Sequence, residues 1–282
     1  MTSFETPGPV TLDVEIGAGS VLVVADTTTT TQIELRPARA GDADALELID
    51  QARIDHRGAT VTVHLPDGRS FGLLRRTPDV VIEARVPAGS GLVVKSKSAD
   101  VQARGELGTT KIETGSGDVQ LADIDGVAEV SSGSGDVQVG TIAGAATVKS
   151  ASGDVMVGTC CSIAKIQTAS GDIAVDTAEA QLDVRSASGD VRIGEADGPV
   201  SARTASGDIS LRRVRGESVQ AMSASGDIEV AVEPGIAVWL DVSSLSGSAS
   251  SSLDTTESQA PGRPTLQIRA STTSGDITIH PA

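Results

Sequence analysis

The sequence predicts an all-β fold, a parallel β-solenoid, and three observations support this prediction. Aspartates recur with an 18-residue period from Asp100 to Asp208 without a slip. Apolar, mostly β-branched residues alternate with polar ones around each aspartate, as they do in half-buried strands. Aromatic residues are scarce, with two Phe, one Trp and no Tyr in 282 residues. The core must therefore consist of small and β-branched side chains, which suit pleated strands better than long helices.

Each 18-residue unit reads as two short strands joined by two corners. When the aspartate is counted as place one, places two, four, seven and thirteen are apolar, and place fifteen is Ser or Thr through Thr204. The apolar places of the unit that starts at Asp118 are Val119, Leu121, Ile124 and Val130. One unit cannot bury its inner face, but units stacked about 4.8 Å apart bury continuous columns. We therefore expect 18-residue coils of a β-helix, wound in the right-handed sense.

The spacing lengthens in the last units. Asp227 follows Asp208 at a spacing of 19, Ser248 takes the next aspartate place at a spacing of 21, and Asp276 follows at 28. The added residues all fall at one corner, where a solenoid tolerates insertions. We expect the coils to stack in chain order, so that 274–282 forms the final, partial coil. Pro281 and the polar stretch 248–265 are then expected to block that end against further strands.

The repeat is weaker before residue 94. Strands are predicted over 10–26, 59–66 and 79–96, and 42–50 is expected to form a short helix with Leu46 and Ile49 facing inward. We divide the chain into 1–93, an N-terminal β-rich cap or set of irregular solenoid turns, and 94–282, a regular β-solenoid with a C-terminal capping insertion.

The lead-in "VPAGSGLVV", followed by iterated "SGSGDVQ" and "SASGDI" units, resembles the bacterial putative-adhesin β-strand-repeat family, a domain of unknown function. The resemblance extends over roughly residues 10–282. It implies a parallel β-helix, association with the cell envelope and no established catalytic activity.

Charge and composition narrow the classes of partner. The formal net charge of −16 repels phosphate backbones, and few rings are available to stack on bases, so nucleic acid is not expected as a partner. The N-terminal residues lack the basic and apolar regions of a signal peptide, and no window approaches 18 consecutive apolar residues. We expect a cytoplasmic protein without a membrane span, with peripheral attachment to the envelope as the alternative.

The aspartate row is the first candidate for chemistry. A row of carboxylates one strand spacing apart could hold calcium, by analogy with glycine-aspartate repeats that bind Ca²⁺ between turns. Each unit supplies only one carboxylate, however, and glycine followed by aspartate also suits a turn with φ > 0 whose Asp and Ser accept backbone N–H groups. We favour the turn and predict no metal site and no cofactor.

Enzymatic alternatives find little support in the residues. Hexapeptide-repeat acyltransferases need an apolar residue at every sixth place and a histidine base, whereas His56, His64 and His280 are placed outside the regular coils. Polysaccharide-acting β-helices use acid pairs or basic clefts with aromatic platforms. The basic and acidic side chains that gather in this sequence are instead expected to form a salt-laced surface: Arg203, Arg212, Arg213, Arg215, Asp197 and Glu217.

Two further features are interpreted as structural. Adjacent cysteines rarely meet disulfide geometry, so Cys160 is expected to be a buried hydrophobe and Cys161 an inert outward thiol. The segment 68–79, "GRSFGLLRRTPD", is expected to plug the N-terminal end of the solenoid, with docking on a partner as the alternative.

These observations predict a structural or protein-interaction scaffold that is not an enzyme. It would contact a protein partner or copies of itself through its side faces, and we assign no catalytic residue and no small-molecule substrate. A polysaccharide-acting enzyme and a calcium-binding adhesin are the alternatives.

Overall fold

The computed structural model describes residues 1–66, 78–253 and 265–282. The chain divides into two compact units, Met1–Gly144 and Ala145–Ala282. We call them the N-terminal unit and the C-terminal unit.

The N-terminal unit is built around parallel strands that pass from one face to the other. Its elements are β1 (Thr2–Glu5), β2 (Thr11–Asp26), β3 (Thr30–Pro37), α1 (Ala43–Asp50), β4 (Arg53–Arg57), β5 (Thr60–His64), β6 (Val80–Pro87), β7 (Ser90–Thr114), β8 (Val119–Ile124), β9 (Ala128–Ser132) and β10 (Val137–Ile142). The first half of β2 pairs in parallel with β5, its second half with β6, and both halves with β7. From β7 onward the coils pair in the register of the sequence repeat, as in Val101 with Val119 and Val119 with Val137.

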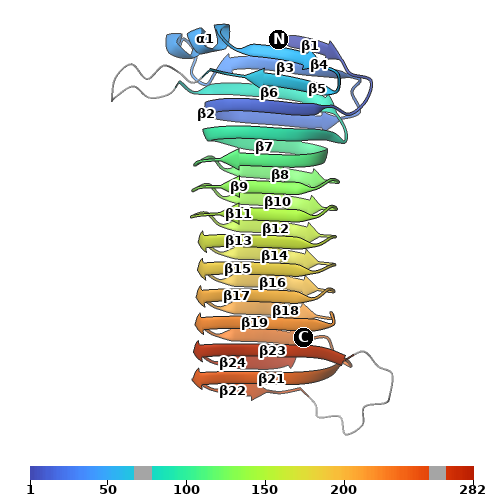
Figure 1. Cartoon of the computed structure of the whole chain (residues 1–282), viewed down its shortest axis with the longest axis vertical. Helices are drawn as coiled ribbons and strands as arrows, with labels where there is room; N and C mark the ends of the chain where they lie inside the picture. The colour runs from blue at the N-terminus through green and yellow to red at the C-terminus, as the bar shows by residue number, and fades with distance from the viewer. Residues whose placement is uncertain (67–77, 254–264) are drawn as a thin grey trace. The chain divides into compact units, whose positions relative to one another are not determined.

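Antiparallel strands and a helix form the first layers of this unit (Figure 1). Strands β1 and β6 pair antiparallel with β3, and β4 pairs antiparallel with β5. The rings of Phe4 in β1 and His56 in β4 lie 5.2 Å apart. Because a strand that reverses direction ends the parallel ladder, these elements close the stack with short edge strands of four and five residues.

Helix α1 begins at Asp42, whose side chain accepts the backbone N–H of Ala45. The helix buries Ala45 and Leu48, whereas Leu46 is 50% exposed. The prediction that Leu46 faces inward was therefore wrong. Ala45 and Leu48, which lie three residues apart, share the buried face of the helix, and α1 contacts β3; Leu46 lies outside that face.

The C-terminal unit consists of parallel strands on two faces. Its strands are β11 (Ala146–Ser150), β12 (Val155–Cys160), β13 (Ala164–Ser170), β14 (Ile173–Ala178), β15 (Leu182–Ser188), β16 (Val191–Ala196), β17 (Val200–Ser206), β18 (Ile209–Val214), β19 (Ser218–Ser225), β20 (Ile228–Val232), β21 (Ala237–Ser246), β22 (Ala249–Ser251), β23 (Thr265–Ser274) and β24 (Ile277–Pro281). Odd-numbered strands pair with odd-numbered strands and even with even, so each coil contributes one strand to each face.

The inward columns predicted from the repeat are buried. One column of the C-terminal unit contains, in spatial order, Val148, Ile166, Val184, Ala202, Ala221, Ala270 and Val242. Its first six members are at most 1% exposed. Strand periodicity, the 18-residue coil and the parallel β-solenoid are thereby confirmed. The division of the chain at residue 93 stays a prediction.

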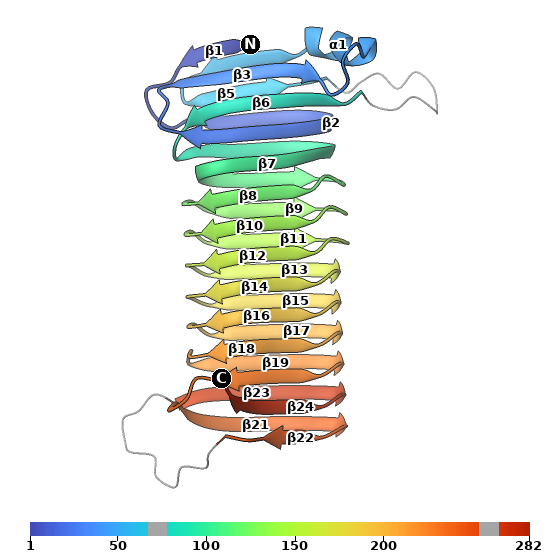
Figure 2. The same ribbon diagram turned by 180° about the vertical axis from the view of Figure 1, so that it is seen from behind.

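The last coils do not stack in chain order. Strand β23 lies between β19 and β21, and β24 lies between β20 and β22 (Figures 1 and 2). The expectation that 274–282 forms the outermost coil was therefore wrong, because β21 and β22 occupy that position. Residues 254–264 of the stretch expected to cover the end lie outside the described residues, as do residues 67–77, which include most of the segment 68–79.

Burial of apolar surface explains the exchanged order. The coil of β23 and β24 places Leu266, Ile268, Ile277 and Ile279 inward, and all four are at most 1% exposed. At the corresponding inward places the short strand β22 has only Ala249 and Ser251, and both are exposed. The more apolar coil therefore lies inside the stack and the more polar one at its edge.

Candidate functional site

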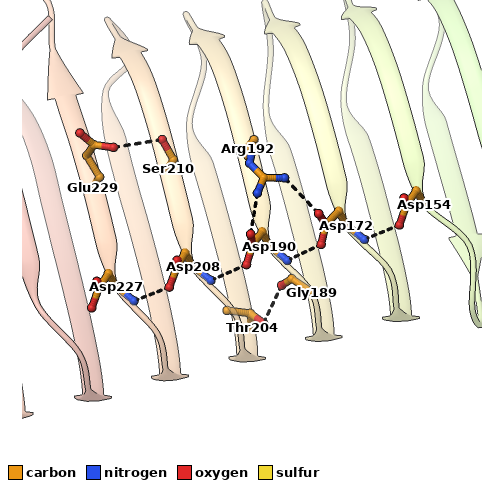
Figure 3. Close-up of polar contacts among 10 residues, drawn as sticks. All are labelled: Asp154, Asp172, Gly189, Asp190, Arg192, Thr204, Asp208, Ser210, Asp227 and Glu229. Carbon is orange, nitrogen blue, oxygen red and sulfur yellow. Dashed lines mark hydrogen bonds and ion pairs between the residues drawn. The ribbon is translucent and has the colours of Figure 1, made fainter.

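The aspartate corners form a hydrogen-bonded ladder in each unit. In the C-terminal unit Asp154 Oδ1 accepts the backbone N–H of Asp172 at 2.8 Å, and Asp172 Oδ1 accepts that of Asp190 at 2.9 Å (Figure 3). The series continues through Asp208 and Asp227 at 2.8 to 3.0 Å. Each carboxylate thus holds the following coil. The corner aspartates accept backbone N–H groups, as expected, and the donor of each bond lies in the following coil.

A second set of bonds runs through the buried hydroxyls at place fifteen. Thr204 Oγ1 donates to the carbonyl of Gly189 in the preceding coil at 3.2 Å, and Ser223 and Thr272 make equivalent bonds at 3.1 Å. The backbone ladder also continues around the corner, where Gly189 N donates to Ser206 O at 2.9 Å. Side-chain and backbone bonds therefore tie each of these corners to its neighbours.

Glycine at the corner is required by close approach as well as by conformation. Gly207 has φ of +143°, and a Cβ atom there would lie 2.2 Å from the carbonyl oxygen of Gly189. In the N-terminal unit Gly135 is not among the glycines with positive φ, yet a Cβ atom would lie 2.1 Å from Gly117 O. The expected positive φ therefore holds for the "ASGD" corners at Gly171, Gly189, Gly207 and Gly226, but not for the first one at Gly153. It does not hold for the "SGSGD" corner at Gly135 either, where the close approach alone demands glycine.

The ladder ends at Ser248. Ser248 N and Oγ both donate to Asp276 Oδ1, at 2.8 and 3.0 Å. Because β22 pairs only with β24 among the described strands, no following backbone N–H is present to meet a carboxylate at this place. Serine in the aspartate place thus marks the outermost coil.

One arginine compensates part of the charge of the row. Arg192 forms ion pairs with Asp172 at 3.0 Å and with Asp190 at 2.6 Å (Figure 3). The backbone N–H of Asp190 and then Arg192 lower the pKa of Asp172, and the bonds from Ser248 lower the pKa of Asp276. Lowered pKa values keep these carboxyl groups ionised, whereas a general acid needs a raised one.

Part of the aspartate row, from Asp190 onward, borders a groove of about 450 Å³ on the outer face of the C-terminal unit, and Arg192 lines it as well. The groove is lined by Asp208, Asp227 and Asp276 along the corner and by Ser210, Glu229 and Thr278 on the strands. Within the described ranges, no group of three or more His, Cys, Asp or Glu side chains is arranged to hold a metal ion. The absence of a metal site and of a cofactor stays a prediction.

Outward side chains on both faces stand in register, one per coil. On one face the row runs through Gln167, Arg185, Arg203, Met222, Ser271 and Ser243. On the other it runs through Met156, Ala174, Arg192, Ser210, Glu229, Thr278 and Ser250. Since pairing fixes the backbone of each strand, the spacing of these side chains along each row is fixed as well.

The arginines singled out from the sequence belong to two faces. Arg213 lies 3.0 Å and Arg215 2.5 Å from Glu195, and Arg215 also lies 3.4 Å from Asp197. Arg203 lies on the other face and donates to Gln220. Sequence reasoning missed Glu195, which the 18-residue register places directly beside Arg213. The network is half exposed, as expected of a salt-laced surface.

Two other expectations concern single residues. His280 lies in β24, a strand of the coil stack, and 3.1 Å from Glu229, so the expectation that it lies outside the coils was wrong.

Cys160 is buried, and burial together with the neighbouring Cys161 raises its pKa to about 11. Burial, followed by the contact with Glu179, also raises the pKa of Cys161. Both thiols therefore stay protonated at neutral pH.

The outer face of the N-terminal unit carries a larger groove, of about 600 Å³. Its floor includes Leu22 and Val24 of β2, and Val24 stands in register between Arg85 and Arg104. Arg85 is paired with Asp26 at 2.6 Å. The groove combines an apolar floor with charged walls of both signs.

Each coil has one strand on each face, and each strand pairs in parallel with the equivalent strand of the next coil. Such coils, stacked through a corner of glycine and aspartate, define a β-solenoid repeat protein. Over residues 15–280 the chain matches the Toastrack DUF4097 family. The chain belongs to this family, which confirms the resemblance seen in the repeats. No curated protein matches the sequence.

Solved structures with a similar backbone come from bacteria. A "putative adhesin" from Bacteroides fragilis is 12% identical with a TM-score of 0.34, and the match covers 100% of this chain and 95% of that one. A "putative lipid binding protein" from Parabacteroides distasonis is 13% identical with a TM-score of 0.37, covering 99% and 95%. Such loose superpositions carry no argument about function. Within the described residues, no helix has the length and apolar character needed to cross a bilayer.

Proposed function

We propose that this protein is a non-enzymatic scaffold that binds protein partners through its side faces. The observation that carries the proposal is the register of outward side chains, one per coil, on both faces of the C-terminal unit. A partner meets Gln, Arg, Ser, Thr and Glu side chains at a fixed spacing on paired strands, so little backbone ordering is needed on binding.

The chemistry of the corner supports the same proposal. The Oδ1 atoms of the aspartates are engaged by backbone N–H groups, and the pKa values of Asp172 and Asp276 are lowered. These carboxylates therefore hold coils together and are poorly suited to proton transfer. Attachment to the cell envelope and a cytoplasmic location both stay predictions.

Site-specific photo-crosslinking in the native host tests the proposal. A photoreactive residue is placed at Ser210 on one face and at Ser201 on the other, with Glu47 of the exposed side of α1 as the matched control. We expect one recurrent protein product from a face position and none from Glu47. Charge reversal at Arg192, which neighbours Ser210 in register, should abolish the product from Ser210. Shortening of polysaccharide chains by the purified protein, lost when Asp208 and Glu229 are changed to Asn and Gln, would overturn the proposal in favour of an enzyme.

A further inference from the structure

Among the described residues, the outermost strand of the C-terminal unit has an open edge. Strand β21 is ten residues long and pairs only with β23 among the described strands. A strand with one partner leaves half of its N–H and C=O groups facing away from the sheet, and such an edge is a template for another strand.

The side chains of β21 are suited to continue the core. Val238, Leu240 and Val242 stand at inward places, in register with Leu266, Ile268 and Ala270 of β23. Those three are buried, whereas Val238, Leu240 and Val242 are only partly covered. On the outer side Trp239 is 45% exposed, with the guanidinium of Arg269 5.7 Å from its ring. The edge thus offers unpaired backbone beside apolar columns that end in solvent.

Charge selects the kind of partner. The chain has a formal net charge of −16, so two copies repel each other over most of their surfaces. The outermost coil is the exception, because residues 237–251 carry one charged side chain, Asp241. Ser248 takes the aspartate place in this coil. The outermost coil therefore lacks the corner carboxylate that an aspartate would bring close to a second copy of the chain.

We propose that β21 pairs with β21 of a second copy of the chain, antiparallel and about a two-fold axis. Residues directly opposite each other in an antiparallel pair point to the same face of the sheet. Inward places must therefore meet inward places, which sets Leu240 opposite itself and Val238 opposite Val242 of the second copy. The interior columns then run from one copy into the other.

The edges of the N-terminal unit limit the assembly to a closed pair. Strands β1 and β4 are four and five residues long, and β4 carries Arg53, Asp55 and Arg57. Short, charged edges resist strand addition. A chain with one adhesive edge forms a two-fold dimer and not an open filament.

Sedimentation velocity of the full chain, from about 0.1 to about 100 μM, measures the assembly over the affinity range usual for protein interfaces. We expect a monomer–dimer equilibrium. The single tryptophan of the chain, Trp239, should shift its emission to shorter wavelength over the same concentrations as the edge is covered. Val242→Lys should weaken the dimer a hundredfold or more by order of magnitude, because a two-fold contact buries the lysine twice. Ser243→Lys, which points outward on the same strand, is the matched control and should leave the dimer within about threefold.

Crosslinking tests the register without relying on a destabilised variant. Leu240→Cys in a Cys160→Ala/Cys161→Ala background should oxidise to a covalent dimer, since opposite Cα atoms about 4.5 to 5.5 Å apart suit a disulfide. Alanine fits at 160 because Ala178 and Ala196 hold that place in the next coils. Ser246→Cys lies far from its copy in this register and should not crosslink. A monomer at all concentrations, an open polymer, or a dimer that withstands Val242→Lys would each overturn the proposal.

Discussion

The first layers of the N-terminal unit and the last coil of the C-terminal unit end a sheet in opposite ways. In the former, β3 and β4 run antiparallel to the strands of the parallel ladder and β1 runs antiparallel to β3. Helix α1 buries Ala45 and Leu48, and the edge strands are short. In the latter, β21 keeps the parallel direction over ten residues and leaves Val238, Leu240 and Val242 partly exposed. The difference teaches that this chain closes one end by changing strand direction, whereas an edge that continues the parallel pattern with a single charged side chain remains able to accept a strand.

The largest expected effect compares an interior coil with the outermost one. Val148 and Val242 belong to one inward column, but only Val148 is fully buried. We expect Val148→Asp to cost more than about 4 kcal/mol or to prevent folding, because it buries an unpaired charge, and Val242→Asp to cost less than about 1.5 kcal/mol. Urea unfolding below the dimer concentration range measures both. Equal losses would contradict the placement of β21 at the edge.

Glycine-to-alanine substitutions should destabilise the coil corners more than the antiparallel hairpin of the N-terminal unit. Gly207→Ala introduces a Cβ atom 2.2 Å from Gly189 O at φ of +143°, and we expect a loss of about 3 kcal/mol or more. Gly58, between β4 and β5, has φ of +59°, and a Cβ atom there would meet no other atom within 4 Å, so Gly58→Ala should cost only about 1 kcal/mol. The difference in melting temperature between the two variants decides whether close stacking or conformation alone selects glycine.

The helix of the N-terminal unit offers a matched pair of leucines. Leu48→Asp should destabilise the unit by about 2 to 3 kcal/mol because Leu48 is buried, whereas Leu46→Asp should change the free energy of unfolding by less than about 0.5 kcal/mol. Chemical denaturation followed by circular dichroism measures both. A larger loss from Leu46→Asp would restore the helix phase expected from the sequence.

Substitutions at Asp208 distinguish the contribution of its hydrogen-bond acceptor from that of its negative charge. Asp208→Ala leaves the backbone N–H of Asp227 without its 2.8 Å partner and should cost about 1 kcal/mol. Asp208→Asn keeps an acceptor oxygen and removes one of a row of like charges, so we expect its melting temperature to match or slightly exceed that of the parent. A loss in Asp208→Asn equal to that in Asp208→Ala would show that the charge itself is needed.

The smallest effect concerns pH. The carbonyl of Pro281 and then Glu229 raise the pKa of His280 above its ordinary value of 6.5. A group whose pKa is raised on folding stabilises the fold fully below its unfolded pKa, and this contribution is lost as the pH rises through the higher folded value. Thermal melts of the parent between about pH 6 and pH 8 should therefore show a slight loss that His280→Gln abolishes. A pH dependence that persists in His280→Gln would place the titrating group elsewhere.

The coils could be predicted because the same residue types recur at the same places of each 18-residue unit. The period, the inward places and the Ser or Thr at place fifteen follow from residue type alone, and the buried columns match them. The aspartate was correctly placed at a structural corner, but the coil that supplies its donor was not predicted, because an acceptor in sequence does not reveal whether the donor lies in its own turn or one coil away.

The exchanged order of the last coils could not be predicted from spacing. The longer spacings before Ser248 and Asp276 are equally compatible with insertions in a stack that keeps chain order. The signal was in the residues: Ser248, Ala249 and Ser251 are poor at the places where Asp276, Ile277 and Ile279 are typical of the repeat. Because the coil of β21 and β22 has small or polar residues at these three places, leaving it at the edge exposes little apolar surface.

The exchange of the last two coils also bears on the order in which the chain is completed during synthesis. Strand β21 leaves the ribosome before β23, the strand against which it pairs. Until 265–274 has been made, the last strand of the stack on this face is β19, which pairs with β23 in the finished protein. The C-terminal unit therefore cannot be completed by adding each coil as it is translated. Strand β21 must stay unpaired until β23 has been made, or it must first pair with β19 and later be displaced from it by β23.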